Sequence, residues 1–259
     1  MILEGKPLAE KIYQELKAQN RHPGLAVVLV GEDPASISYA KVKEKAAENL
    51  GAIFKLYHLP NFSTQEVVEK LISDLNQNKH IQGIVVQLPL PEDFDVDAVL
   101  SKISSEKDID GFSGKFPAPT AQAILEILKF YKIDIARKKI VIVGHGRLVG
   151  RPLSEMLRKK GITPIICTSS SKISSATIDA DIIVSATGEP GLIKPEMVSE
   201  KAVIIDAGTA ESRGKIRGDV DASVYEKVSA YTPTPGGVGP VTVACLMRNL
   251  IEGAKKEEK

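Results

Sequence analysis

Residues 138–152 read KKIVIVGHGRLVGRP, and this stretch decides the predicted fold. Its four β-branched apolar residues predict a buried strand, the glycines behind them predict a tight turn, and the residues that follow predict a helix. Such a helix start presents unpaired backbone N–H groups, which suit a pyrophosphate. The candidate glycines are Gly144, Gly146 and Gly150.

The spacing of these glycines leaves two interpretations open. GxGxxxG is one residue longer than the common dinucleotide-binding fingerprint. Glycine turns also end strands in α/β domains that bind no dinucleotide. Nucleotide binding therefore needs support from other parts of the chain.

Short β-branched runs alternate with helical patterns along nearly the whole chain, which is typical of parallel sheets built from βαβ units. A first series of strands is expected at 25–30, 52–59 and 81–88, with helices at 36–50 and 64–78. A second series is expected at 140–143, 163–167, 181–185, 203–206 and 228–231, with only helices or short turns between the strands. The sequence therefore predicts an α/β protein with two sheets.

A segment rich in glycine and proline, KDIDGFSGKFPAPT at 107–120, separates the two series and predicts an interdomain connection. A helix at 121–131 should follow it. The last apolar helix, 241–254, comes after the second sheet is complete and is expected to return to the first domain. We therefore expect one domain from 1–119 with 240–259, and another from 120–239.

Composition favours a small-molecule ligand. The chain has 259 residues, 43% of them hydrophobic, and a formal net charge of +1, which argues against binding to nucleic acid or to an acidic membrane. Cys167 and Cys245 stand far apart without a CxxC motif, so no metal site is expected. Residues 1–17 carry charges throughout, which predicts neither a signal peptide nor a membrane span. A cytoplasmic protein is expected.

In the first domain, the segment 31–51 predicts a helix that Asp33 caps and Gly51 ends. Tyr39 and Lys43 are four residues apart on one face of this helix. They could present an aromatic ring and an amine side by side near the strand ends. The plain alternative is a partly buried ring beside a surface charge.

Three further features could contribute to a site. Gln87 ends the strand in GIVVQLPLP, where its amide could orient a lysine or simply cap the strand. Asp110 lies in the interdomain segment, where it could line a cleft or act only as a turn residue. The segment YTPTPGGVGPVTVA at 231–244 predicts a rigid turn that a flat ligand can approach closely, or else a linker.

The cofactor question depends on the strand after the glycine turn. NAD enzymes usually offer an acidic residue there to the ribose hydroxyls, whereas this chain reads CTSSSK at 167–172. Ser169 with Lys172, helped by His145 or Arg147, could hold a 2′-phosphate instead. This pattern favours NADP over NAD, and a solvated serine turn is the alternative.

Taken together, DPASISYAKVK, QLPLP, KDIDGF, VGHGRLVGRP and TPTPGGVGPVTVA occur in the order and spacing of one family. The chain resembles the methylenetetrahydrofolate dehydrogenase/cyclohydrolase family over nearly its whole length. The resemblance implies an N-terminal α/β folate domain, a C-terminal Rossmann-type NAD(P)-binding domain with the last helix crossing back, and a homodimer. It also implies oxidation of 5,10-methylenetetrahydrofolate with NADP and hydrolysis to 10-formyltetrahydrofolate. These reactions belong to one-carbon metabolism, which serves purine, histidine and methionine biosynthesis.

The same resemblance implies roles for individual residues. Lys43 would be the cyclohydrolase residue, Tyr39 would stack on the folate, Gln87 would partner the lysine and Asp110 would grip the pterin. The other substrate contacts would be Leu88, Pro89, Pro235, Gly236 and Gly237. The cofactor contacts would be Gly144, His145, Gly146, Arg147, Val149, Gly150, Ser169 and Thr209.

Departures from the family pattern leave two other functions open. The stretch after Gly111 is shorter than is typical, and His145 and Thr209 stand where other residues are common, so NAD remains an alternative to NADP. A dehydrogenase acting alone on a methylene pterin is one alternative function. A non-catalytic dinucleotide-binding module is another, although the presence together of Tyr39, Lys43, Gln87 and Asp110 argues against it.

Overall fold

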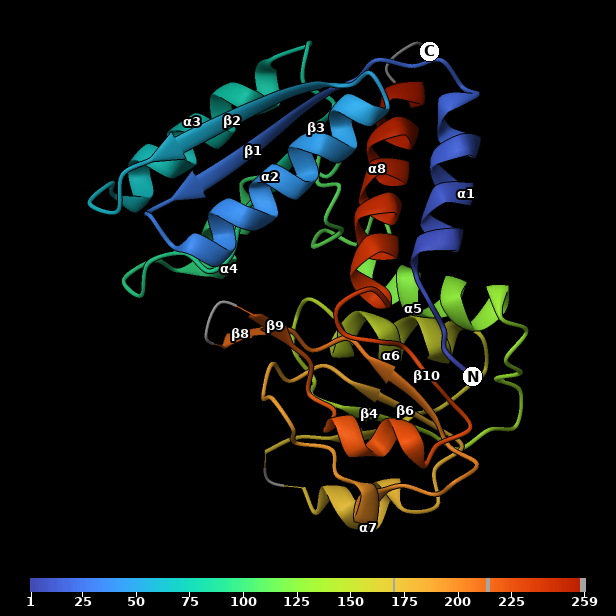
Figure 1. The fold of residues 1–259 in the computed structure, drawn as a ribbon. Helices are drawn as coiled ribbons and strands as arrows, with labels where there is room; N and C mark the ends of the chain where they lie inside the picture. Colours follow the sequence, from blue (N-terminus) through green and yellow to red (C-terminus); the bar gives the residue numbers. More distant parts are fainter. Residues whose placement is uncertain (170, 213–214, 257–259) are drawn as a thin grey trace. The chain divides into compact units, whose positions relative to one another are not determined.

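The computed structural model describes residues 1–169, 171–212 and 215–256. Contacts between residues divide the chain into two compact units (Figure 1). Unit 1 contains Met1–Glu10 and Thr120–Thr242, and unit 2 contains Lys11–Pro119 and Val243–Lys259. Each unit has its own parallel sheet, which confirms the predicted α/β class.

The sheet of unit 2 has three parallel strands in the order β2-β1-β3. These are β1 (Gly24–Val30), β2 (Ile53–Leu59) and β3 (Gly83–Val86). Helices α2 (Pro34–Asn49) and α3 (Gln65–Gln77) cover opposite faces of this sheet (Figure 1). The chain crosses one face through α2 between β1 and β2, and it crosses the other face through α3 between β2 and β3. The carboxyl ends of β1 and β3 thus lie next to each other at the point where the winding reverses, where α/β sheets bind ligands.

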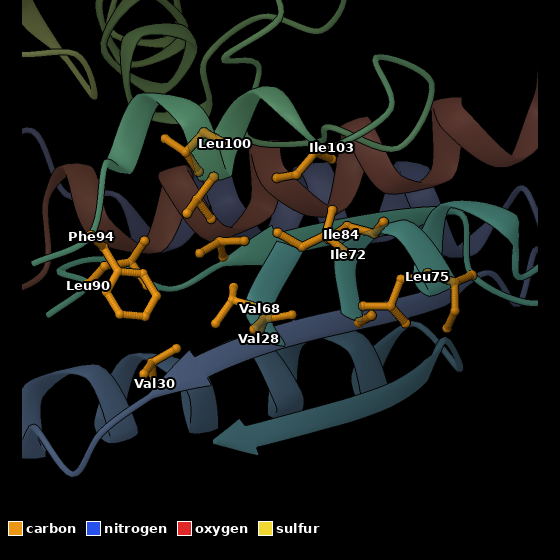
Figure 2. Close-up of a cluster of buried hydrophobic side chains, with 14 residues drawn as sticks. Val28, Val30, Val68, Ile72, Leu75, Ile84, Leu90, Phe94, Leu100 and Ile103 are labelled. Carbon is orange, nitrogen blue, oxygen red and sulfur yellow. The ribbon is translucent and has the colours of Figure 1, made fainter. Parts of the chain in front are cut away.

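The core of unit 2 forms between this sheet, α3 and α4 (Val96–Ser101). Alternate residues of the buried strands point to one face because strand side chains have a period of two. Figure 2 shows the side chains that meet there, among them Val28, Val30, Ile84, Val68, Ile72, Leu75 and Ile103. This packing fixes the strand ends on which the candidate site is built.

The predicted start and end of helix α2 are confirmed. The Asp33 carboxylate accepts a hydrogen bond from the backbone N–H of Ser36 at 2.8 Å, and Pro34 is the first helical residue. Gly51 follows the helix with φ +70°, a conformation that glycine adopts without strain. Both ends of the helix are therefore fixed, and this sets which residues lie on its polar face.

The sheet of unit 1 has five parallel strands in the order β10-β7-β6-β4-β5. They are β4 (Ile140–Val143), β5 (Ile165–Cys167), β6 (Ile182–Ser185), β7 (Val203–Asp206) and β10 (Ala230–Tyr231). All five predicted strands are present, some shorter than expected. The remaining elements of this part are α5 (Pro119–Phe130), α6 (Gly150–Lys159), α7 (Ile173–Thr177), η1 (Pro195–Met197) and η2 (Ala222–Glu226). The winding reverses at β4, so the switch point lies between β4 and β6.

The expectation that only helices or short turns separate the later strands was wrong. An antiparallel pair, β8 (Ala210–Ser212) and β9 (Lys215–Arg217), lies between β7 and β10. Each of these strands is only three residues long, and ESRGKIR at 211–217 offers no apolar run. A pattern based on alternating hydrophobicity therefore could not find them.

The amino-terminal residues pack in unit 1, whereas the expected division placed all of 1–119 in the first domain. The N–H of Leu3 donates to the carbonyl of Tyr231 at 2.7 Å, and the N–H of Tyr231 donates to the carbonyl of Met1 at 3.0 Å. Leu3 is fully buried. Residues 1–3 therefore extend the edge of the sheet at β10, an interaction between distant segments that no local pattern reveals.

The last helix, α8 (Val238–Lys256), packs on the sheet of the first half of the chain, as predicted. The side-chain amide of Asn249 donates to the carbonyls of Ile109 and Pro117 at 2.8 and 2.9 Å. The first helix, α1 (Lys6–Lys17), runs beside α8 (Figure 1). Among the described residues, the apolar length of every helix falls short of what crossing a membrane requires.

Candidate active site at the strand ends

Lys43 and Gln87 come together at the switch point of unit 2. Gln87 directly follows β3, is only 7% exposed, and donates its backbone N–H to the carbonyl of Val28. The Nζ of Lys43 donates to Oε1 of Gln87 at 2.7 Å. The amide nitrogen of Gln87 donates to the carbonyl of Leu88 at 2.7 Å, which directs the amide oxygen toward the lysine. The sequence suggested this partnership, and the structure places the two groups in contact.

Asp110 supplies the charge that acts on Lys43. Burial lowers the pKa of Lys43, and the Asp110 carboxylate partly opposes this effect. Burial also raises the pKa of Asp110 to about 6. The charge of Lys43 acts to lower this pKa, and the charge of Asp108 acts to raise it. Both side chains keep part of their surface accessible. The site thus holds an amine that loses its proton more easily than usual beside a carboxyl group that titrates near neutral pH.

The segment that carries Asp110 is fixed by its neighbours. The buried carboxylate of Asp108 accepts hydrogen bonds from the backbone N–H groups of Gly111 and Ser113. Gly111 has φ +80°, and a Cβ there would lie 2.5 Å from the carbonyl oxygen of Phe116. These contacts close a tight turn directly after Asp110. Together with the Asn249 bonds, they fix the backbone on both sides of Asp110.

Tyr39 lies one helical turn before Lys43 on α2, and 39% of its surface is exposed. A ring with that much free surface can stack on a flat heterocycle. Leu88 and Pro89, joined by a cis peptide bond, follow Gln87 at the same strand end. The predicted site residues of the first domain, Tyr39, Lys43, Gln87, Leu88, Pro89 and Asp110, therefore all belong to unit 2.

The glycine turn of unit 1 is tightly packed on one side and open on the other. A Cβ at Gly144, which has φ +96°, would lie 2.5 Å from the carbonyl oxygen of Ala186. A Cβ at Gly150 would lie 2.0 Å from the carbonyl oxygen of Gly144, whereas a Cβ at Gly146 would meet nothing within 4 Å. The open side of the turn at the start of α6 fits a dinucleotide pyrophosphate, which needs bare backbone and N–H donors.

The residues expected to hold a 2′-phosphate lie at the same edge of this sheet. β5 pairs with β4, with Val143 opposite Cys167, so the exposed Ser169 follows the strand next to the glycine turn. Lys172 is exposed at the start of α7. Residue 170, within the predicted serine turn, lies outside the described residues. His145 and Arg147 belong to the turn itself, as does Val149, which precedes the first residue of α6.

The turn after β10 holds the remaining predicted substrate contacts. Thr234 and Pro235 are joined by a cis peptide bond, and Gly236 has φ +108°. The carbonyl of Gly236 accepts the N–H of Gly5 at 2.8 Å, and the N–H of Gly237 donates to the carbonyl of Pro233. The turn is thus closed by its own backbone and by the amino-terminal segment.

Sequence reasoning missed the loop after β6. Residues 186–188, Ala-Thr-Gly, lie between the glycine turn and Thr209, because β6 separates β4 from β7. The strand at 181–185 was predicted, and the carboxyl ends of parallel strands share one edge. This signal could have identified the loop as a candidate part of a cofactor site. Among the described residues, no group of three or more acidic, histidine or cysteine side chains is arranged to hold a metal ion.

Comparison with known proteins places the chain in a family. A family model for the tetrahydrofolate dehydrogenase/cyclohydrolase catalytic domain matches residues 3–110, and the model for the NAD(P)-binding domain of the same family matches residues 118–258. The bifunctional protein FolD of Aquifex aeolicus is 43% identical over 279 aligned positions, which cover 99% of this chain and 96% of that protein.

Solved structures of the same family are similar over the full length. The bifunctional FolD methylenetetrahydrofolate dehydrogenase/cyclohydrolase of Campylobacter jejuni is 39% identical with a TM-score of 0.93, and 99% of each chain is covered. The FolD enzyme of Trypanosoma brucei, solved with NADP cofactor and an inhibitor, is 32% identical with a TM-score of 0.94, covering 100% of this chain and 98% of that one. This chain belongs to the tetrahydrofolate dehydrogenase/cyclohydrolase family.

Proposed function

We propose that this protein oxidises 5,10-methylenetetrahydrofolate to 5,10-methenyltetrahydrofolate with NADP and then hydrolyses the product to 10-formyltetrahydrofolate. The observation that carries this proposal is the hydrogen bond of 2.7 Å from Lys43 to Gln87 at the switch point, with Asp110 acting on the same amine. Family membership and the open glycine turn support the two activities together.

Lys43 is the group that manages protons in the hydrolytic step. The methenyl carbon is cationic, so water can attack it if a neighbouring group takes up the proton that the water loses. Burial lowers the pKa of Lys43 and thereby raises the share of neutral amine at neutral pH. Gln87 accepts one N–H of this amine and fixes its position. Asp110 binds the substrate and limits how far the pKa of the lysine falls.

The oxidation step needs positioning more than acid or base catalysis. NADP, when bound, would supply the hydride acceptor, and the methenyl product would be stabilised as a cation by its two flanking nitrogens. The N–H groups at the start of α6 and the open backbone at Gly146 bind the pyrophosphate. Ser169, with Arg147 and Lys172, binds the 2′-phosphate. Thr209 and the turn at Pro235, Gly236 and Gly237 complete the pocket.

The test of the function is to follow NADPH formation and methenyl hydrolysis for wild type and for Lys43→Met. Methionine fills the volume of the lysine stem but cannot carry a proton. We expect the wild type to form the 10-formyl product and the variant to reduce NADP but stop at the methenyl compound. A wild type that reduces neither NADP nor NAD would refute the proposal. A variant that still hydrolyses the methenyl compound at the wild-type rate would remove Lys43 from the mechanism.

The cofactor preference has its own test. In Ser169→Asp, a carboxylate would repel a 2′-phosphate and accept hydrogen bonds from free ribose hydroxyls. We expect the ratio of kcat/KM for NADP to kcat/KM for NAD to fall by about tenfold or more, since one unfavourable charge contact costs about 1.4 kcal/mol or more. An unchanged ratio would show that Ser169 does not contact the 2′-phosphate.

We also infer that the protein works as a cytoplasmic homodimer that supplies one-carbon units for purine, histidine and methionine biosynthesis. The support for this inference is the resemblance of the motifs to the family. Light scattering on the purified protein measures the assembly directly, and a monomer at micromolar concentration would contradict it.

A further inference from the structure

Two buried aspartates that play no part in the proposed chemistry lie together at the strand ends of unit 1. Asp206 is the last residue of β7, and Asp219 follows β9; their exposed fractions are 2% and 0%. The backbone N–H of Asp219 donates to the Asp206 carboxylate at 3.1 Å. Burial raises the pKa of Asp206 to about 6, and the charge of Asp219 adds to this effect. Burying two carboxyl groups costs free energy unless hydrogen bonds compensate for it. The partners of these hydrogen bonds therefore indicate what the pair does.

Asp219 fixes the loop that follows β6. Its Oδ2 accepts the hydroxyl of Ser185 at 2.8 Å and the backbone N–H of Thr187 at 2.7 Å. Ser185 is the last residue of β6, and Thr187 lies in the loop at 186–188. One carboxylate oxygen thus connects the end of a central strand to the loop that leaves it.

Asp206 fixes the loop that follows β7 and the end of β10. Its Oδ1 accepts the N–H of Gly208 at 3.2 Å, and its Oδ2 accepts the N–H of Val220 at 3.3 Å. Its own N–H donates to the hydroxyl of Thr232 at 2.8 Å, and its carbonyl accepts the hydroxyl of Thr234 at 3.5 Å. The two carboxylates therefore connect the loops after β6 and β7, and the backbone of Asp206 adds the link to the residues after β10.

Two glycines show how closely the backbone approaches these carboxylates. A Cβ at Gly208 would lie 1.9 Å from Oδ1 of Asp219, and a Cβ at Gly218 would lie 1.8 Å from Oδ2 of Asp206. No other residue fits at either position without displacing a carboxylate. The loop at 207–209 therefore packs directly against the carboxylate of Asp219 through Gly208.

The order of the strands places these loops at one end of the cofactor. The pyrophosphate belongs at the turn after β4, and the 2′-phosphate belongs near Ser169, after β5. A dinucleotide crosses the switch point. Its nicotinamide end must therefore extend to the other side of β4, over the loops after β6 and β7.

We propose that Asp219, together with Asp206, is a positioning residue of the dehydrogenase reaction, which holds the loops at 186–188 and 207–209 against the nicotinamide end of NADP. This inference rests on the proposed NADP site. Positioning of this kind affects the oxidation of the methylene compound but not the hydrolysis of the methenyl compound, which needs no cofactor. The two activities of one protein therefore distinguish it from a role in stability alone.

The experiment measures both activities on the same preparation. The first is the single-turnover rate of NADPH formation from methylenetetrahydrofolate, and the second is the hydrolysis of added methenyltetrahydrofolate without NADP. Asp219→Asn keeps the shape of the side chain but removes its charge and turns one acceptor into a donor. Ser185→Ala removes one of the two donors to Asp219. Asp221→Asn, at an exposed residue two positions away, is the matched control.

We expect Asp219→Asn to slow NADPH formation by about tenfold to a hundredfold, the effect of small misplacements of reacting groups. Ser185→Ala should slow it less, hydrolysis should keep the wild-type rate in both, and the KM for NADP should change less than the rate. If Asp219→Asn does not fold, the rate of NADPH formation by Ser185→Ala tests the inference.

The inference is overturned if Ser185→Ala and a folded Asp219→Asn form NADPH at the wild-type rate. It is also overturned if both activities fall in parallel with Tm. Failure of the wild type to reduce either NADP or NAD would instead refute the proposed function.

Discussion

At the scale of single residues, the contact between Lys43 and Gln87 decides how the lysine works. A buried lysine that acts as a base is active when neutral, so hydrolysis should rise with pH through the lowered pKa of Lys43. Gln87→Glu would place a carboxylate at hydrogen-bond distance from this amine. That charge raises the pKa of Lys43, so the rising part of the pH profile should move to higher pH. Each pH unit of displacement lowers the rate at a fixed pH by about tenfold.

The measurement is the pH dependence of hydrolysis of added methenyltetrahydrofolate, with Gln14→Glu on the exposed face of α1 as the control. If Lys43 works as a charged donor, hydrolysis falls as pH rises, and Gln87→Glu extends activity to higher pH. Gln87→Glu moves the profile to higher pH in both cases, but at a fixed pH on the limb it lowers the rate if Lys43 is a neutral base and raises the rate if Lys43 is a charged donor. The sign of this change separates the two mechanisms.

The sequence indicated the residues of the site around Lys43 because each of them belongs to a pattern that is visible in neighbouring residues. The four-residue spacing of Tyr39 and Lys43 on a capped helix sets their shared face, and parallel strands bring their carboxyl ends to one edge. The sequence did not indicate Asp206 and Asp219. An aspartate at a strand end is usually solvated, and only the folded chain shows that both are buried and share neighbours.

At the scale of elements, the glycine turn and α6 test the cofactor site. Gly146→Ala adds a methyl group into open space, so the free protein should keep its Tm, while the methyl group should obstruct the pyrophosphate and weaken NADP binding by about tenfold or more. Gly150→Ala adds a methyl group 2.0 Å from the Gly144 carbonyl oxygen. It should therefore destabilise the protein by about 1–3 kcal/mol.

Thermal unfolding and NADP titration measure the two effects separately. If Gly146→Ala binds NADP as tightly as the wild type, then the pyrophosphate does not lie on the open side of this turn. Hydrolysis of added methenyltetrahydrofolate by Gly146→Ala should stay at the wild-type rate, because that reaction uses no cofactor.

The elements themselves were predictable wherever hydrophobic runs were long. β4 and β7 begin and end at the predicted residues, since both are fully buried strands; β4 lies between Lys139 and Gly144, and β7 ends at the polar residue Asp206. β8 and β9 escaped prediction because three-residue strands with charged sequences give no hydrophobic pattern, and only their pairing with each other reveals them. The loop at 186–188 was overlooked although the strand before it was predicted.

At the scale of the whole molecule, the first residues of the chain bind by backbone hydrogen bonding to a turn that lies more than 200 positions away in the sequence. The N–H of Gly5 donates to the carbonyl of Gly236, and a Cβ at Gly5 would lie 1.8 Å from the carbonyl oxygen of Gly237. The amino-terminal segment thus supports the turn that holds the predicted contacts Pro235, Gly236 and Gly237. No periodicity or motif in residues 1–10 signals this role, because the interaction involves backbone alone.

Gly5→Ala should therefore displace this turn without touching any side chain of the site. We expect a lower Tm, by about 1–3 kcal/mol of lost stability, and higher KM values for methylenetetrahydrofolate and NADP in the dehydrogenase assay. Glu4→Ala, at the exposed neighbouring position, should change neither quantity. Thermal unfolding and steady-state kinetics on the three proteins provide the measurement. A lower Tm with both KM values unchanged would show that the segment stabilises unit 1 but does not shape the pocket.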